Sequence, residues 1–153
     1  MRRALVGFLL ATLATATLLL WVDQPLRTAA APHGILSFEF AGEAFTASAI
    51  LSSWDAAARR SAELSLGLDA LFPLLYATTL GLALWLRGAP RLARAQAIAG
   101  GLDLVENAAL LAILQGDPQD GLPQLAFACA TGKMFLLAWG LLALLMLPWR
   151  RRR

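Results

Sequence analysis

Long apolar stretches separated by short polar connections dominate the sequence. Four of them are long enough to cross about 30 Å of hydrocarbon at about 1.5 Å per helical residue. We expect spanning helices at about Ala4–Val22, Leu64–Leu86, Ala95–Gln115 and Gln124–Pro148. The connections at Arg87–Arg94 and Gly116–Pro123 are short, so sequential helices should be antiparallel neighbours. The pattern predicts a single all-α membrane domain, residues 1–153, folded as an integral up-down bundle of four transmembrane helices.

A loop of about 40 residues, Asp23–Glu63, separates the first two predicted spans and is the only sizeable segment outside them. Within it, Ile35–Phe40 alternates like a short strand. Glu43–Leu51 and Ser53–Leu64 have helical patterns, with Ser53 as a candidate N-cap. Four large apolar side chains are too many for a solvated loop: Phe38, Phe40, Phe45 and Trp54. We expect them to rest on the membrane surface or to cap the bundle.

The composition agrees with a membrane protein. Hydrophobic residues make up 59% of the chain, whereas soluble domains average about 45–50%. Nine of the 13 Lys and Arg residues fall on one side of the predicted spans: Arg2, Arg3, Arg87, Arg91, Arg94 and Arg150 to Arg153. No Asp or Glu lies on that side. The positive-inside rule therefore predicts a bacterial inner (plasma) membrane protein with both termini cytoplasmic and a periplasmic loop.

The basic C-terminal tail favours contact with lipid headgroups rather than nucleic acid. The predicted partner is therefore the lipid bilayer, and no nucleic-acid partner is expected. The N-terminus fits either a secretory signal or an anchor. The run Ala4–Val22 is long for a signal core, and Trp21 stands at its outer end as interfacial anchors do. Pro32 follows the nearest small-residue cleavage site, so we interpret the first span as an uncleaved anchor.

Polar residues lie well inside three of the spans, where a charge costs at least a few kcal/mol: Asp69, Tyr76, Asp103, Glu106, Asn107 and Lys133. Helix rise puts Lys133 about 13 Å below the outer surface, at the level of Glu106 and Asn107. Tyr76 lies about 18 Å deep, at the level of Asp103. Helical spacing turns these groups inward. We predict that the six residues form a ligand-binding site between the second, third and fourth spans, with Lys133 paired to Glu106 and Asn107 completing that network.

The chemistry of this site is left open. Three buried acids face one lysine, so we expect at least one carboxyl to be protonated at neutral pH. The catalytic residues are unknown; the candidates are Glu106, Asp103 and Lys133. No Ser-His or Cys-His pair lies inside, because His33 and Cys129 are each the single residue of their type and His33 is in the loop. The alternative is a structural network of interhelical contacts, worth about 0.6 kcal/mol each.

No P-loop, dinucleotide fingerprint or haem motif occurs, so no cofactor is expected. Asp103 and Glu106 share a helix face and could hold a cation. With a lysine nearby and no histidine in the membrane, we expect no metal.

Three motifs resemble those of an uncharacterised family of small bacterial four-span membrane proteins. They are D-x-x-F-P-x-x-Y at Asp69–Tyr76, D-x-x-E-N at Asp103–Asn107, and Lys133 before the aromatic Phe135. The resemblance covers most of the chain and implies a four-span fold without any particular chemistry. Membrane glutathione-transferase-like proteins are of similar length, but the arginine-rich motif expected for their cofactor site is missing here.

Three functions remain open from the sequence. The protein binds a lipid-like or other small ligand, or a partner, at the polar site. Alternatively, it is an intramembrane enzyme acting on a lipid or isoprenoid, with a carboxyl and Lys133 as acid and base. A third alternative is a proton-linked transport component, for which four short spans would have to form a homo-oligomer.

Overall fold

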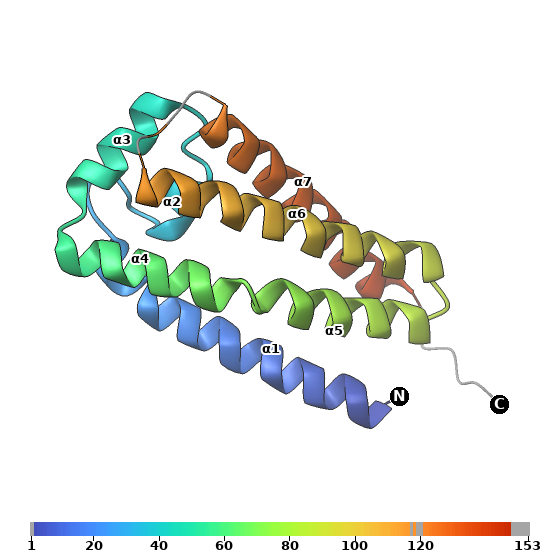
Figure 1. Cartoon of the computed structure of the whole chain (residues 1–153). Coiled ribbons are helices and arrows are strands. Elements are labelled where there is room, and N and C mark those ends of the chain that lie inside the picture. The colour runs from blue at the N-terminus through green and yellow to red at the C-terminus, as the bar shows by residue number, and fades with distance from the viewer. Residues whose placement is uncertain (1, 117, 119–120, 148–153) are drawn as a thin grey trace.

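The computed structural model describes residues 2–116, 118 and 121–147, and these residues form helices and connections without a strand (Figure 1). The elements are α1 (Arg2–Val22), the 3-10 turn η1 (Gln24–Leu26), α2 (Ile35–Glu39), α3 (Ala44–Ser53), α4 (Ala56–Asp69), α5 (Phe72–Leu86), α6 (Pro90–Gln115) and α7 (Leu122–Met146). Four stretches are long and apolar enough to cross a membrane: α1, α4 with α5, α6 and α7. The prediction of four spanning helices is thus confirmed by length and composition. The predicted end of the last span at Pro148 and the arginines 150–153 lie outside the described residues.

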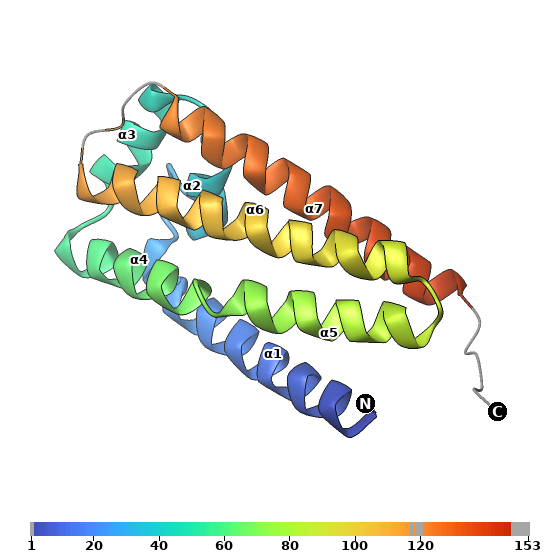
Figure 2. The ribbon, with the colours of Figure 1, turned by 45° about the vertical axis from the view of Figure 1, so that its right-hand side comes forward.

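The long helices run beside one another, and α2 and α3 cover one end of them (Figures 1 and 2). The start of α1 lies at the opposite end, together with the connection between α5 and α6. Helix α6 packs between α5 and α7, while α1 packs on α4 and α5. Half of the most apolar stretch of α6 is therefore buried, whereas almost none of the most apolar stretch of α1 is buried.

The outer surface of the long helices is apolar. Leu10 and Leu13 on α1 are exposed, as are Leu142 and Leu145 on α7. Charged and polar residues, including Asp103 of α6, lie inside instead. An exterior of this kind is typical of helices surrounded by lipid rather than by water.

Helix α4 continues into the second spanning stretch. We expected a loop helix at Ser53–Leu64 and a separate span from Leu64, but a single helix runs from Ala56 to Asp69. The carboxylate of Asp55 caps it by accepting a 2.8 Å hydrogen bond from the N–H of Ala58. Ser53, the expected N-cap, is instead the last residue of α3, and its hydroxyl donates to a carbonyl within that helix.

A break separates α4 from α5 in the middle of the second spanning stretch. Helix α4 ends at Asp69, and α5 begins at Phe72. Pro73 explains the break, because it has no N–H to offer the carbonyl of Asp69 and its ring crowds that carbonyl. Beyond the break, Gly100 of α6 lets α5 approach closely: a Cβ there would lie 3.2 Å from the Cβ of Ala77. This close approach positions the polar residues of α5 against α6.

The strand expected at Ile35–Phe40 was wrong, because this segment forms helix α2. Gly34 begins the helix with φ of 60°, and the Asp23 carboxylate accepts a 2.7 Å hydrogen bond from the N–H of Ile35. The helix buries Phe38 against Trp54, with ring centroids 5.3 Å apart. These two rings cap the bundle as expected, whereas Phe45 is exposed.

Candidate functional site

The centre of the site is Lys133 of α7, which reaches two acids on α6. Its Nζ lies 2.7 Å from Oδ1 of Asp103 and 2.9 Å from Oε1 of Glu106. Asp103 and Glu106 are three residues apart, so one face of α6 presents both carboxylates to α7. All three side chains are buried. The expected pairing of Lys133 with Glu106 is therefore present, and Asp103 shares it.

Glu39 joins this cluster from outside the long helices. Its Oε2 lies 3.4 Å from Nζ of Lys133, and the residue is only 8% exposed. Helix α2 carries Glu39 over the end of the bundle, with Phe38 in the core beside it. Glu39 lies within the predicted loop and was not among the predicted site residues. Its position between two phenylalanines, in a segment too apolar for a solvated loop, was the available signal.

Two further hydrogen bonds tie the cluster to α4 and α5. Tyr76 donates from its hydroxyl to Oδ2 of Asp103 at 2.8 Å, as the shared depth of the two residues predicted. Asn107 donates from Nδ2 to Oδ2 of Asp69 at 2.7 Å. Asn107 was expected to complete the Lys133–Glu106 network, and this was wrong: the amide faces α4. All six predicted residues nevertheless gather in one region.

Carboxylates outnumber cations in this cluster. Asp69, Asp103, Glu106 and Glu39 lie around a single ammonium group, that of Lys133, among the residues that the structure describes. Two buried atoms, Oε2 of Glu106 and Oδ1 of Asn107, have no hydrogen-bond partner there. A buried polar atom left unpaired costs about 1–3 kcal/mol. The cluster is therefore not a closed network in which every group satisfies another.

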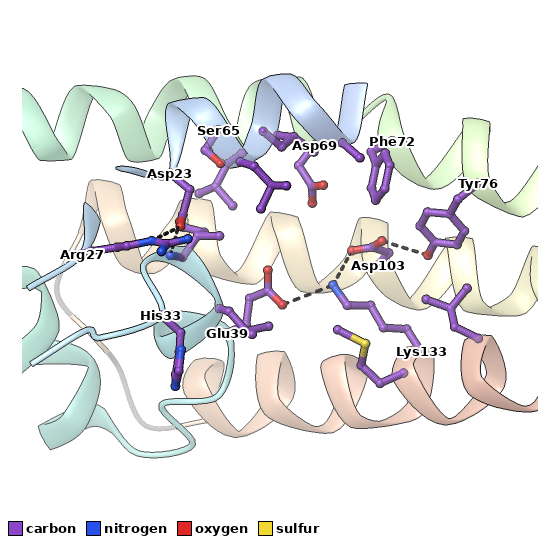
Figure 3. Close-up of a pocket in the computed structure, with 18 residues that line it drawn as sticks. Asp23, Arg27, His33, Glu39, Ser65, Asp69, Phe72, Tyr76, Asp103 and Lys133 are labelled. Carbon is purple, nitrogen blue, oxygen red and sulfur yellow. Dashed lines mark hydrogen bonds and ion pairs between the residues drawn. The ribbon is translucent and has the colours of Figure 1, made fainter. Parts of the chain in front are cut away.

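A cavity of about 460 Å³ lies beside the cluster (Figure 3). Carboxylates, Tyr76 and Lys133 form its polar wall. The remaining walls are largely apolar, from α1, α2, α4, α5 and α7: Ala16, Leu19, Leu20, Ile35, Leu36, Leu66, Phe72, Met134 and Leu137. Asp23, Arg27 and His33 line the cavity at the end covered by the loop, where Arg27 pairs with Asp23 at 3.3 Å.

Gln96 of α6 is a further buried polar residue, but it lies apart from the cavity. Its Nε2 donates to the carbonyl of Leu136 on α7 at 3.1 Å. Gly140 leaves room for the amide, since a Cβ there would lie 2.4 Å from Nε2. This contact joins α6 to α7 and has a structural role.

The geometry limits the chemistry available to this site. Lys133 contacts three carboxylates, which favours its charged form and leaves it a poor general base. The ammonium also occupies the place between Asp103 and Glu106 where a bridging cation would bind. Among the described residues, no group of three His, Cys, Asp or Glu side chains is arranged to hold a metal ion. The arrangement is suited to binding a polar group at one wall of an apolar cavity.

Comparison of the chain with protein-family models, with curated proteins and with solved structures gave no match. The grounds for a function are therefore the polar cluster, the cavity beside it and the four apolar helices.

Proposed function

We propose that this is an integral inner-membrane protein that binds a lipid-like, amphiphilic ligand in the cavity beside Lys133. One observation carries the proposal: the cavity of about 460 Å³ has charged groups on one wall and apolar side chains on the others. Small-molecule sites usually have volumes of about 300–1,000 Å³ and combine a few polar groups with an apolar lining. The polar wall would hold the head group of the ligand and the apolar walls its hydrocarbon part.

The position of Lys133 favours binding over the enzymatic alternative. An intramembrane enzyme acting on a lipid or isoprenoid would need an acid or base free to exchange a proton with its substrate. Three carboxylates hold the ammonium of Lys133 instead, so an enzyme would have to use the cavity carboxyls without Lys133 as their partner. For a proton-linked transport component, the relevant groups are the surplus carboxyls, and four spans would have to assemble into an oligomer.

The topology we propose is an up-down bundle with cytoplasmic termini and a periplasmic loop that contains α2 and α3. Four of the described arginines support it. Arg2 and Arg3 start α1, and Arg87 and Arg91 flank the connection between α5 and α6 at the same end of the molecule (Figure 1). Reporter fusions after Arg153 and within residues 34–42 would test this topology. An outward-facing reporter at the C-terminus would contradict it.

Filling the cavity tests the ligand proposal directly. Ala16 of α1 lines the cavity, whereas Ala14, two residues earlier, is exposed on the outside of the helix. Ala16→Phe should remove ligand space, and Ala14→Phe is the matched control. Native mass spectrometry of the protein released from membranes should show a bound amphiphile on the wild type and on Ala14→Phe, with much less on Ala16→Phe. Equal loading of the two folded variants would mean that the cavity is not the binding site.

A further inference from the structure

We propose that the ligand is an amphiphile with a cationic ammonium head group, which Glu39 and Asp69 hold while its hydrocarbon part reaches the lipid between α1 and α7. This inference rests on the proposed function and specifies the class of ligand.

Acidic groups outnumber basic groups around the cavity. Four carboxyl groups surround one lysine in the described part of the chain, so acid exceeds base even when one carboxyl is protonated. Arg27, which also lines the cavity, is paired with Asp23. Anionic groups that lack counterions in an apolar setting are costly to bury. An ammonium ligand supplies the missing positive charge, whereas a carboxylate or phosphate head group would add to the repulsion.

Three of the acids have hydrogen-bonding capacity to spare. Glu106, with its unpaired Oε2, does not line the cavity, whereas Asp69 and Glu39 do. Asp103 is fully engaged, because Oδ1 accepts from Lys133 and Oδ2 accepts from Tyr76. Asp69 uses Oδ2 to accept from Asn107, and no N–H of the described residues donates to its Oδ1. Glu39 contacts Lys133 through Oε2 alone, and no described N–H donates to its Oε1.

The carboxylates of Glu39 and Asp69 face the cavity. Figure 3 shows the Glu39 and Asp69 side chains pointing into the space between α4 and α7. Glu39 is more than nine-tenths buried, so bulk water does not replace the missing donor freely. Hydrogen bonds from a charged nitrogen to a carboxylate are about twice as strong as neutral ones. A head group with N–H donors between these two acids would therefore satisfy both.

The cavity also reaches the outer surface of the helices. Leu20 of α1, Leu36 of α2 and Met134 of α7 line the cavity and are exposed. Helix α1 packs on α4 and α5, whereas α7 packs mainly on α6, so this side of the cavity lies between α1 and α7. A hydrocarbon chain leaving there would meet lipid. This opening toward lipid favours an amphiphile over a small water-soluble amine as the ligand.

The test measures binding to the full chain in nanodiscs of zwitterionic phosphatidylcholine. The probes are dodecylamine, dodecan-1-ol, dodecanoate and butylamine, and the readout is the probe-dependent rise of the unfolding temperature followed by circular dichroism. Dodecylamine should bind roughly ten- to a hundredfold more tightly than dodecan-1-ol, as expected for charge-assisted hydrogen bonds. Dodecanoate and butylamine should bind more weakly still.

A matched pair of variants locates the head group. Glu39→Gln keeps the size of the side chain, and Lys133 retains Asp103 and Glu106, so the variant should fold. It should bind dodecylamine about tenfold more weakly or worse. Glu43→Gln neutralises an exposed acid of the same loop that does not line the cavity, and should bind as the wild type does.

The outcomes separate this inference from the proposed function. If dodecan-1-ol or dodecanoate binds as tightly as dodecylamine, the proposal of a cationic head group is wrong, but the proposal that the cavity binds an amphiphile is still supported. If butylamine binds as tightly as dodecylamine, the hydrocarbon chain contributes nothing to binding, and the proposal that the ligand is an amphiphile is wrong. If no probe binds the folded wild type, both proposals fail. Wild-type affinity for dodecylamine in a folded Glu39→Gln variant overturns the assignment to Glu39.

Discussion

The carboxylate of Asp103 lies 2.7 Å from the ammonium of Lys133 and joins α6 to α7 at the level where it also accepts a hydrogen bond from α5. One carboxylate therefore connects three spanning helices. Both of its oxygens accept a hydrogen bond. Glu39 and Asp69, which face the cavity, each have one carboxylate oxygen to which no described N–H donates.

Replacing Lys133 with methionine should strongly destabilise the protein. The change leaves three buried carboxylates, those of Asp103, Glu106 and Glu39, without their cation. Breaking a buried pair on one side typically costs about 3–5 kcal/mol. Unfolding by SDS titration in mild detergent would measure the loss. Adding Glu106→Gln to Lys133→Met should recover part of it, because one of the uncompensated charges is removed; a double variant no more stable than the single one would disprove the pairing.

Tyr76→Phe should lower the free energy of unfolding by about 1.5–3 kcal/mol, the usual contribution of a hydrogen bond to a charged group. The substitution removes the hydroxyl that donates to Asp103 and keeps the ring that packs against Phe72. Thr17→Val is the control, since it removes an exposed hydroxyl bonded only to a carbonyl of its own helix. That change should stay within about 0.5 kcal/mol. Equal effects of the two variants would mean that the buried hydroxyl contributes nothing specific.

Two neighbouring glycines of α6 should respond in opposite directions to alanine. A Cβ at Gly100 would lie 3.2 Å from the Cβ of Ala77 and 3.3 Å from the carbonyl oxygen of Pro73, so Gly100→Ala should cost about 1–3 kcal/mol. A Cβ at Gly101 meets nothing within 4 Å, and Gly101→Ala should stabilise the helix by about 0.5–1 kcal/mol. Thermal unfolding of both variants checks this. A neutral Gly100→Ala would show that α5 and α6 have room to separate.

Asp69 lines the cavity and is only half-buried, so a cysteine there should be accessible from the loop side. In a background with Cys129→Ala, Asp69→Cys should react with a small water-soluble thiol reagent added from outside. Ala109→Cys is the control, because Ala109 lies in the closed core away from the cavity and should be protected. Complete protection at position 69 in a folded variant would favour a purely structural cluster.

Residue depth was the part of the site that the sequence determined best. Helix rise is nearly constant, so it placed Tyr76 level with Asp103 and Lys133 level with Glu106, and both pairs are in contact. The direction in which a side chain faces was harder to predict. Glu106 and Asn107 are adjacent in sequence and point about 100° apart on the helix, so one reaches α7 and the other reaches α4.

The loop could not be placed from the sequence, because helix rise says nothing about where a connection folds back. Glu39 was therefore missed, although it contacts Lys133. Alternation over Ile35–Phe40 fits a short strand, but it also fits a single helical turn that buries Phe38. Ser53 and Asp55 are both good N-caps two residues apart, but Ser53 is the last residue of α3, and the carboxylate of Asp55 caps α4.

The contact between Glu39 and Lys133 also sets an order for the assembly of the chain. Helix α2 precedes α6 and α7 in the chain, so Glu39 is synthesised before its partner Lys133. The contact between Glu39 and Lys133 can form only after α7 has been synthesised, which makes it a late step in the assembly of the molecule. Phe38 and Trp54 share their core cluster with residues of α6 and α7, so the hydrophobic cover of the loop is complete only when the whole chain has been made.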